Sequence, residues 1–368
     1  MPNKKERIVQ GDETIGIEKN WDNFEDWFTF KENPSTYTEL PKNMILYGPP
    51  GTGKTYHTIL YAVAIIEEKS LSEVANEPYE AIAKRYHHYQ TNGLIEFTTF
   101  HQSYSYEEFI EGIRPVMNHN ADDDVTDIQY EISPGLFKNF CDRAKQSLPT
   151  NYIFIIDEIN RGNIAKIFGE LITLIEPSKR IGQIEGAYAR LPYSKSPFGV
   201  PDNVYLIGTM NTADHSIATI DTALRRRFQF KEIQPDPTIL DGIYVEELSI
   251  KELLSHLNQK ISVLYDREHT IGHAYFMPLK NTPTIETLAS IFKSTILPLL
   301  QEYFYEDYEK IRLVLGDNKK MNQSEQFIFK KTIDYDELFG NTDFELDDSF
   351  QYEINATAFS NIEAYRSI

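Results

Sequence analysis

The sequence has 368 residues, a length that suits one large domain or two of ordinary size. Its 56 acidic and 36 basic side chains give a formal net charge of −20. This charge excludes a basic surface over the whole chain that would bind the phosphate backbone of a nucleic acid. Hydrophobic residues make up 41% of the chain, enough for a sizeable core, so wholesale disorder is also excluded.

A single cysteine, Cys141, excludes an intrachain disulfide framework and a cysteine-rich zinc module. The longest useful apolar run, Ile59–Ile66, is far shorter than the ~18 to 20 residues that a membrane span needs. The first 42 residues are polar and acidic and show no secretory signal. We therefore expect a soluble, cytoplasmic protein that contacts no membrane.

Residues 1–42 form a lead-in that is too polar to fold alone, although aromatic residues between Trp21 and Phe30 predict a helix that packs onto the next part of the chain. From Asn43 the pattern alternates between strands and helices. Continuous apolar strands between helices are typical of a parallel sheet covered on both faces. We predict this α/β fold for residues 43–232, with strands at 44–47, 94–100, 151–156 and 203–208 and a helix at 54–69.

Two segments interrupt this alternation. Residues 116–133 carry an acidic turn and predict a hairpin inserted between helices at 106–113 and 134–146. Residues 179–201 are rich in Gly, Pro, Ser and Tyr and predict a second hairpin or loop.

The last part of the chain has a different pattern. We expect the strands to stop after Phe230, and Pro235-Asp236-Pro237 marks a boundary. Helical patterns at 245–263 and 284–305 predict a smaller helical lid domain, followed by a C-terminal segment, within residues 233–368.

A phosphate-binding motif lies between the first strand and the first helix. The run Gly48-Pro49-Pro50-Gly51-Thr52-Gly53-Lys54-Thr55 fits G-x-x-x-x-G-K-[ST]. Its glycines let backbone N–H groups surround phosphate oxygens, Lys54 reaches the β- and γ-phosphates, and the Thr55 hydroxyl can ligate Mg²⁺. We expect the whole run and the adjoining Tyr56 to bind nucleotide.

An acidic pair ends a buried strand about a hundred residues later. Asp157 would hold Mg²⁺, and Glu158 could polarise the water that attacks the γ-phosphate. Alternatively, the two acids are simply solvated residues at the end of a strand. The phosphate-binding motif elsewhere in the sequence favours the catalytic interpretation over this alternative.

The following strand ends in Met210-Asn211-Thr212-Ala213-Asp214, where Asn211 could fix the attacking water and Asp214 is a candidate nucleotide-binding residue. Alternatively, Asn211 and Asp214 cap the next helix, expected at 217–224. That helix leads into Arg225-Arg226-Arg227. Arg225 and Arg226 could reach the γ-phosphate of a neighbouring subunit, whereas an i,i+4 pair with Asp221 is the alternative for Arg225.

The order of these motifs resembles that of the AAA+ family of ring-forming nucleotidases. Longer stretches are similar to the McrB-like branch, the motor subunits of modification-dependent (5-methylcytosine) restriction systems. These stretches are 100–112, Ile155-Ile156-Asp157-Glu158-Ile159-Asn160-Arg161, Met210-Asn211-Thr212-Ala213-Asp214, 223–228 and, in the lid, Ile271-Gly272-His273-Ala274-Tyr275-Phe276.

The resemblance implies GTP as the substrate with Mg²⁺, a homo-hexameric ring, and a McrC-like nuclease partner for DNA translocation and cleavage in antiviral defence. Two features depart from the family pattern. His215 stands where an arginine is usual, which weakens a contact there or makes it pH-dependent. Only 42 residues precede the motor, so a DNA-reading domain is missing from this sequence or another polypeptide reads the DNA.

Two alternatives remain open from the sequence alone. ATP-driven proteins of the MoxR type, which remodel protein complexes, share the Asp-Glu-Ile-Asn-Arg motif, so ATP is possible as the nucleotide. A nucleotide-gated assembly scaffold would bind but hardly hydrolyse, and the presence of both Glu158 and Asn211 argues against it.

Overall fold

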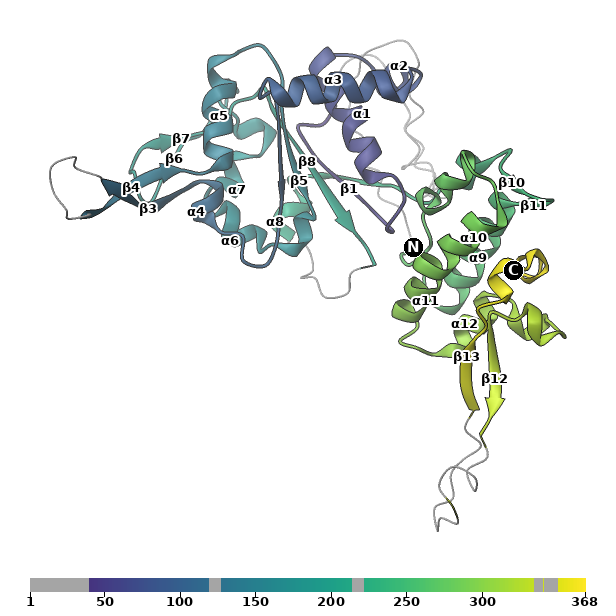
Figure 1. Ribbon diagram of the computed structural model, residues 1–368. Coiled ribbons are helices and arrows are strands. Elements are labelled where there is room, and N and C mark those ends of the chain that lie inside the picture. Colours follow the sequence, from purple (N-terminus) through teal and green to yellow (C-terminus); the bar gives the residue numbers. More distant parts are fainter. Residues whose placement is uncertain (1–39, 119–126, 214–221, 334–339, 341–349) are drawn as a thin grey trace, which may run out of the picture. The chain divides into compact units, whose positions relative to one another are not determined.

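The computed structural model describes residues 40–118, 127–213, 222–333, 340 and 350–368 (Figure 1). The helix expected near Trp21 therefore lies outside the described residues. A five-stranded sheet with the strand order β2-β5-β8-β1-β9 forms the centre of the first part, and every pairing in it is parallel. Its strands are β1 (Asn43–Gly48), β2 (Ile95–Thr99), β5 (Tyr152–Asp157), β8 (Val204–Asn211) and β9 (Gln229–Glu232).

Both faces of this sheet are apolar, because alternate residues of each strand point to opposite sides. On one face, Met44, Leu46, Ile153 and Ile155 pack with residues of α1 (Lys54–Glu67). On the other, Ile45 and Phe154 join a second cluster. Helices α2 (Leu71–Ala75) and α3 (Tyr79–Thr91) lie beside α1, and α4 (Tyr106–Phe109), α5 (Leu136–Gln146), α6 (Ile164–Phe168) and α7 (Leu171–Leu174) cover the second face (Figure 1).

Two short hairpins are inserted into this layered core. Strands β3 (Glu111–Asn118) and β4 (Asp127–Pro134) pair antiparallel, as do β6 (Ala189–Arg190) and β7 (Pro197–Phe198). The prediction of a helix through Ile113 is wrong, because α4 ends at Phe109 and the chain then pairs with β4. The buried Glu111, at the base of the β3–β4 hairpin, accepts from the N–H groups of Tyr193 (3.0 Å) and Ser194 (2.9 Å), in the loop that connects β6 to β7.

The C-terminal part is mainly helical and has its own hydrophobic cluster. It contains α9 (Ile250–Leu264), α10 (Ile285–Ile291), a π-helical turn (Phe292–Ile296), α11 (Leu297–Tyr303), α12 (Tyr308–Val314) and α14 (Ile362–Arg366). Within the described ranges, no helix combines the length and the apolar character that crossing a membrane requires.

The expectation that strands stop after Phe230 is wrong. Strand β9 runs on to Glu232, and two antiparallel pairs follow, β10 (Tyr244–Val245) with β11 (Leu248–Ser249) and β12 (Ile328–Thr332) with β13 (Phe350–Ile354). The strands of the first pair have only two residues, too few for a period-two pattern to show. Strand β12 carries two adjacent lysines, which hide its alternation.

Candidate nucleotide-binding site

The phosphate motif forms a loop between β1 and α1, at the carboxyl edge of the sheet. Gly51 and Gly53 have φ angles of 74° and 86°, in the left-handed region that side chains disfavour. The Lys54 ammonium donates to the carbonyl oxygens of Gly48 (2.9 Å) and Pro49 (2.8 Å), so it lies inside the loop. The residues expected to bind phosphate are therefore brought together, at the N-terminal end of a 14-residue helix whose dipole favours anions.

Asn211 lies beside the start of this loop. Strand β8 pairs with β1 so that Asn211 is the register partner of Gly48, and the Thr212 N–H donates to the Gly48 carbonyl at 3.1 Å. The phosphate loop and the tip of β8 therefore share one edge of the sheet.

The acidic pair lies at the same edge, because β5 is the other neighbour of β8. Asp157 accepts a hydrogen bond from the Thr209 hydroxyl. Glu158 accepts one from the Asn211 side-chain amide (2.5 Å) and pairs with Arg161 (3.3 Å). The backbone of Glu158 is left-handed, with a φ of 51°. Such a conformation is rare for residues other than glycine and is found at functional sites more often than elsewhere.

Two of these residues fit Mg²⁺ by their chemistry. Thr55 supplies a hydroxyl oxygen and Asp157 a carboxylate oxygen, and both are hard donors of the kind that Mg²⁺ prefers. Magnesium at nucleotide sites takes one or two protein oxygens and completes its coordination with phosphate oxygens and water, so this small donor set is sufficient.

The arginine run leads to the opposite end of the sheet. Helix α8 (Thr222–Arg225) continues into Arg226 and Arg227, and the side chains of Arg225 and Arg226 are exposed. The Arg227 side chain is mostly buried and pairs with Glu176 at 2.7 Å. Its carbonyl oxygen accepts from Asn43, the first residue of β1, whereas the phosphate loop follows the last residue of β1. Asp214, His215 and Asp221 lie outside the described residues.

The lid motif Ile271–Phe276 packs onto the phosphate loop, a contact that the sequence did not indicate. The Ala274 N–H donates to the Gly51 carbonyl at 3.0 Å, and a Cβ on Gly272 would lie only 2.0 Å from that oxygen. The His273 imidazole lies near Gly53, and its Nδ1 accepts from the Asp236 N–H at 3.1 Å. Burial lowers the pKa of His273, so the imidazole is neutral at pH 7.

Tyr56, the last residue expected to bind nucleotide, is 39% exposed at the start of α1. Its ring stacks on Tyr79, with centroids 5.0 Å apart. The aromatic pair lies next to the loop and presents its surface to solvent.

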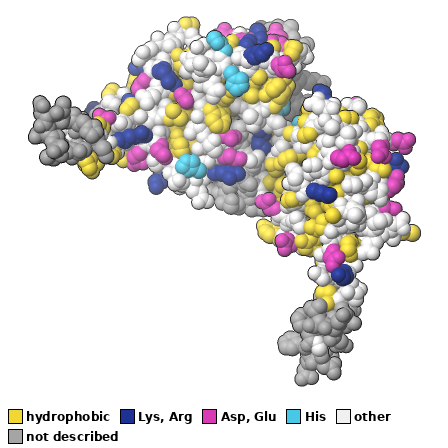
Figure 2. All heavy atoms as spheres, in the orientation of Figure 1, with side chains coloured by type: hydrophobic (Ala, Val, Ile, Leu, Met, Phe, Trp, Pro, Cys, Tyr) yellow, Lys and Arg dark blue, Asp and Glu magenta, His cyan; other side chains and the backbone are white. Residues whose placement is uncertain are grey.

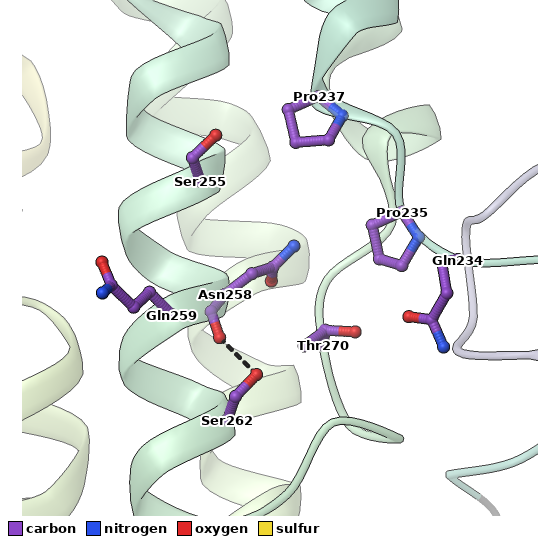
Figure 3. Close-up of a pocket in the computed structure, with 8 residues that line it drawn as sticks. All are labelled: Gln234, Pro235, Pro237, Ser255, Asn258, Gln259, Ser262 and Thr270. Atoms are coloured by element: carbon purple, nitrogen blue, oxygen red, sulfur yellow. Dashed lines mark hydrogen bonds between the residues drawn. The ribbon is translucent and has the colours of Figure 1, made fainter. Parts of the chain in front are cut away.

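A hollow of about 340 Å³ lies between α9 and the segment that joins the two parts of the chain (Figure 3). Gln234 and Pro235 line one side, and Ser255 and Gln259 line the other. Asn258, also in the lining, donates to the Ile271 carbonyl (2.9 Å) and accepts from the Ile271 N–H (2.7 Å). Asn258 therefore fixes the backbone just before the lid residues that touch the phosphate loop.

A strand–loop–helix phosphate site with an acidic strand tip beside it defines the P-loop class of nucleotidases. Comparison with known proteins agrees with this class. The family model of the AAA domain (dynein-related subfamily) matches residues 43–228, and that of the McrB alpha-helical lid domain matches residues 249–312. The chain belongs to the AAA family and is a McrB-like member of it.

Two curated relatives extend the comparison. The chain is 38% identical over 303 residues to the "Type IV methyl-directed restriction enzyme EcoKMcrB subunit" of Escherichia coli (strain K12), a match covering 76% of this chain and 58% of that protein. It is 27% identical over 227 residues to the "Type II restriction enzyme BsuMI component YdiS" of Bacillus subtilis (strain 168), covering 54% of this chain and 59% of that protein. The chain thus spans less than two thirds of each relative.

Proposed function

We propose that this chain is the GTP-hydrolysing motor of a McrBC-like DNA restriction complex. One observation carries the proposal: Gly48, Glu158 and Asn211 meet at one edge of the sheet, through the register of β1 with β8 and the bond between β5 and β8. The similarity to restriction-enzyme subunits supports the biological setting. GTP in preference to ATP follows from the resemblance to McrB-like motors.

The residues divide the work of phosphoryl transfer. The loop N–H groups and Lys54 bind the phosphates, and Thr55 and Asp157 would hold Mg²⁺, which would supply positive charge to neutralise the phosphates. Glu158 orients the attacking water and takes its proton, and Asn211 fixes the position of that water. The Asp157–Thr209 hydrogen bond keeps the Asp157 carboxylate in place at the end of β5.

Arg225 and Arg226 act on the nucleotide of a neighbouring subunit in this proposal. Asn43 and Gly48 are five residues apart along β1, about 16 Å at the usual rise of a strand. Arg227, the residue after them, is tied to the Asn43 end, whereas the phosphate loop follows the other end of β1, and the side chains of Arg225 and Arg226 face solvent. A trans arginine needs a ring, and we propose a homo-hexamer.

The nuclease and the DNA contact belong to other parts of the complex. We propose that a McrC-like subunit cuts the DNA, and that DNA is bound through that complex or through a further DNA-reading domain. The nucleotide-binding part is assigned to residues 43–232 and the lid with the C-terminal segment to residues 233–368. Asp214 remains a proposed nucleotide-binding residue.

Hydrolysis of GTP and ATP, measured side by side with the same preparation, tests the proposal. We expect turnover with Mg²⁺ and a clear preference for GTP, which a McrC-like partner increases. A preference for ATP would instead favour a MoxR-type remodeller. Tight binding of both nucleotides without turnover would favour an assembly scaffold.

A further inference from the structure

Arg180 is a fully buried cation with an unusual set of partners. Its side chain is 0% exposed, and its guanidinium donates to the carbonyl oxygens of Ile175 (3.0 Å), Pro201 (3.3 Å) and Val204 (3.2 Å). Burial lowers its pKa to about 10, so it remains charged at neutral pH. A buried charge is costly unless its donors are paired, so this residue ties the surrounding backbone together firmly.

The next link is Asn43, which is 3% exposed at the first position of β1. Its Oδ1 accepts from Arg180 at 2.6 Å. Its amide nitrogen donates to the carbonyls of Ile175 (2.8 Å) and Arg227 (2.9 Å). The Asn43 side chain therefore joins Arg180 directly to the end of the segment that carries the arginines.

Arg227 has a second anchor on the same segment of backbone. Its guanidinium pairs with Glu176, which directly follows Ile175. Arg225 and Arg226 thus immediately precede a residue that is held at two points. Asn43 binds the carbonyl group of Arg227, and Glu176 binds its side chain.

We propose that Asn43 and Arg180 are positioning residues for the trans arginines. They hold the chain after α8 so that Arg225 and Arg226 meet the nucleotide of the next subunit in a set geometry. Because Arg180 also holds Pro201, at the base of the 181–201 insertion, movement of the arginines is transmitted to that insertion. The inference rests on the proposed function, since it requires arginines that act between subunits.

Asn43→Asp is the sharpest probe. The aspartate keeps the size of the side chain and the acceptor for Arg180, but it loses both donors and turns an anion toward the Arg227 carbonyl. Misplaced arginines should lower kcat by about tenfold or more, a part of the roughly 10³ to 10⁵ that such arginines contribute. Nucleotide affinity should change less than about twofold, because the phosphate loop lies at the other end of β1.

Asn203→Asp is the matched control. Asn203 is also buried, and its amide donates to two backbone carbonyls, those of Ala144 (2.9 Å) and Thr150 (2.6 Å). Asn203 adjoins β8 at the same end of the sheet, but neither of these carbonyls belongs to the segment around Arg227. The control should lose as much thermal stability as Asn43→Asp and keep its kcat.

Mixed rings separate positioning from general damage. Asn43→Asp chains can bind nucleotide but present poor arginines, whereas Lys54→Ala chains present good arginines but bind nucleotide poorly. Mixing them should restore turnover severalfold over either alone. If Asn43→Asp fails to fold, Asn43→Ser takes its place, since it removes the amide without adding a charge.

Three results would overturn the positioning role: a kcat for the Asn43 variant within about twofold of wild type, an equal loss in Asn203→Asp, or no recovery on mixing with Lys54→Ala. The double variant Arg225→Ala, Arg226→Ala is measured in the same assay. If the double variant keeps full turnover, Arg225 and Arg226 do not act on the nucleotide of a neighbouring subunit, and the positioning role of Asn43 and Arg180 is wrong as well. If it is inactive while the Asn43 variant is fully active, only the positioning role is wrong.

Discussion

The side-chain amide of Asn211 donates directly to the Glu158 carboxylate, which joins the tip of β8 to the tip of β5. This bond uses one carboxylate oxygen and one amide hydrogen, and a carboxylate and an amide each have further hydrogen-bonding groups. We expect the attacking water to bind beside the pair, in contact with both side chains.

Replacing Asn211 tests this arrangement. Asn211→Ala should lower kcat by roughly two orders of magnitude while nucleotide affinity stays near wild type, because the lost contact positions only the water. Asn211→Asp should be at least as damaging, since it sets a second anion against Glu158. Steady-state hydrolysis and nucleotide titration measure the two effects. An Asn211→Ala chain that binds poorly and hydrolyses what it binds at the normal rate would contradict the assignment.

Glu158→Gln separates binding from chemistry. Glutamine keeps the size of the side chain and a contact to Asn211, but it cannot take a proton from water. Turnover should fall by about two orders of magnitude or more, with nucleotide still bound. The variant should also accumulate in the assembled, nucleotide-bound form, which sedimentation can detect. Hydrolysis at the wild-type rate would remove Glu158 from the catalytic role.

Two histidines beside the phosphate loop predict a loss of stability in mild acid. Burial lowers the pKa of both His57 and His273 below the ordinary value of 6.5, and His57 also lies near Lys231. Protonated His273 could not accept the Asp236 N–H. Below about pH 6.5 the unfolded chain then binds more protons than the folded one, so each imidazole lowers the unfolding free energy by at most about 1.4 kcal/mol per pH unit.

Thermal melts from about pH 8 to about pH 5.5 measure this effect. We expect the Tm to be steady above about pH 7 and to fall below about pH 6.5, the ordinary pKa of histidine. His273→Asn keeps an acceptor near the position of Nδ1 and cannot be protonated, so its Tm should fall less steeply. Parallel curves for the two chains would show that His273 does not contribute.

The sequence predicts best those features that depend on residues close to one another along the chain. The phosphate loop and the Asp157–Glu158 strand tip are contiguous patterns, and adjacency of parallel strands brings Asn211 to them. No contiguous sequence pattern indicates the role of Asn43 or Arg180, because the backbone carbonyl groups that they bind are scattered from residue 175 to residue 227. The end of α4 is predicted wrongly because its start is marked by Ser105 and Glu108, whereas its stop depends on pairing with β4.

The charge distribution predicts weak DNA binding by this chain alone. The net charge is −20, and on the face shown in Figure 2 basic side chains are scattered among acidic and uncharged ones. Affinity for duplex DNA depends strongly on neutralised phosphates, so we expect a Kd no tighter than about 10⁻⁴ to 10⁻⁶ M at physiological salt. A mobility-shift titration measures it. A tight, methyl-specific shift by the isolated chain would mean that this polypeptide itself reads DNA.

The central claim is that the active site is completed between subunits, and subunit mixing tests it most directly. Lys54→Ala removes charge-assisted bonds worth roughly 1.5 to 3 kcal/mol each, so it should bind nucleotide at least about tenfold more weakly. Arg225→Ala, Arg226→Ala should bind nucleotide normally and fail to hydrolyse it. Each chain supplies what the other lacks, so mixed rings should recover part of the wild-type turnover. Complete inactivity of rings shown to contain both chains would contradict the claim, since the arginines would then act within their own chain or only hold the segment in place.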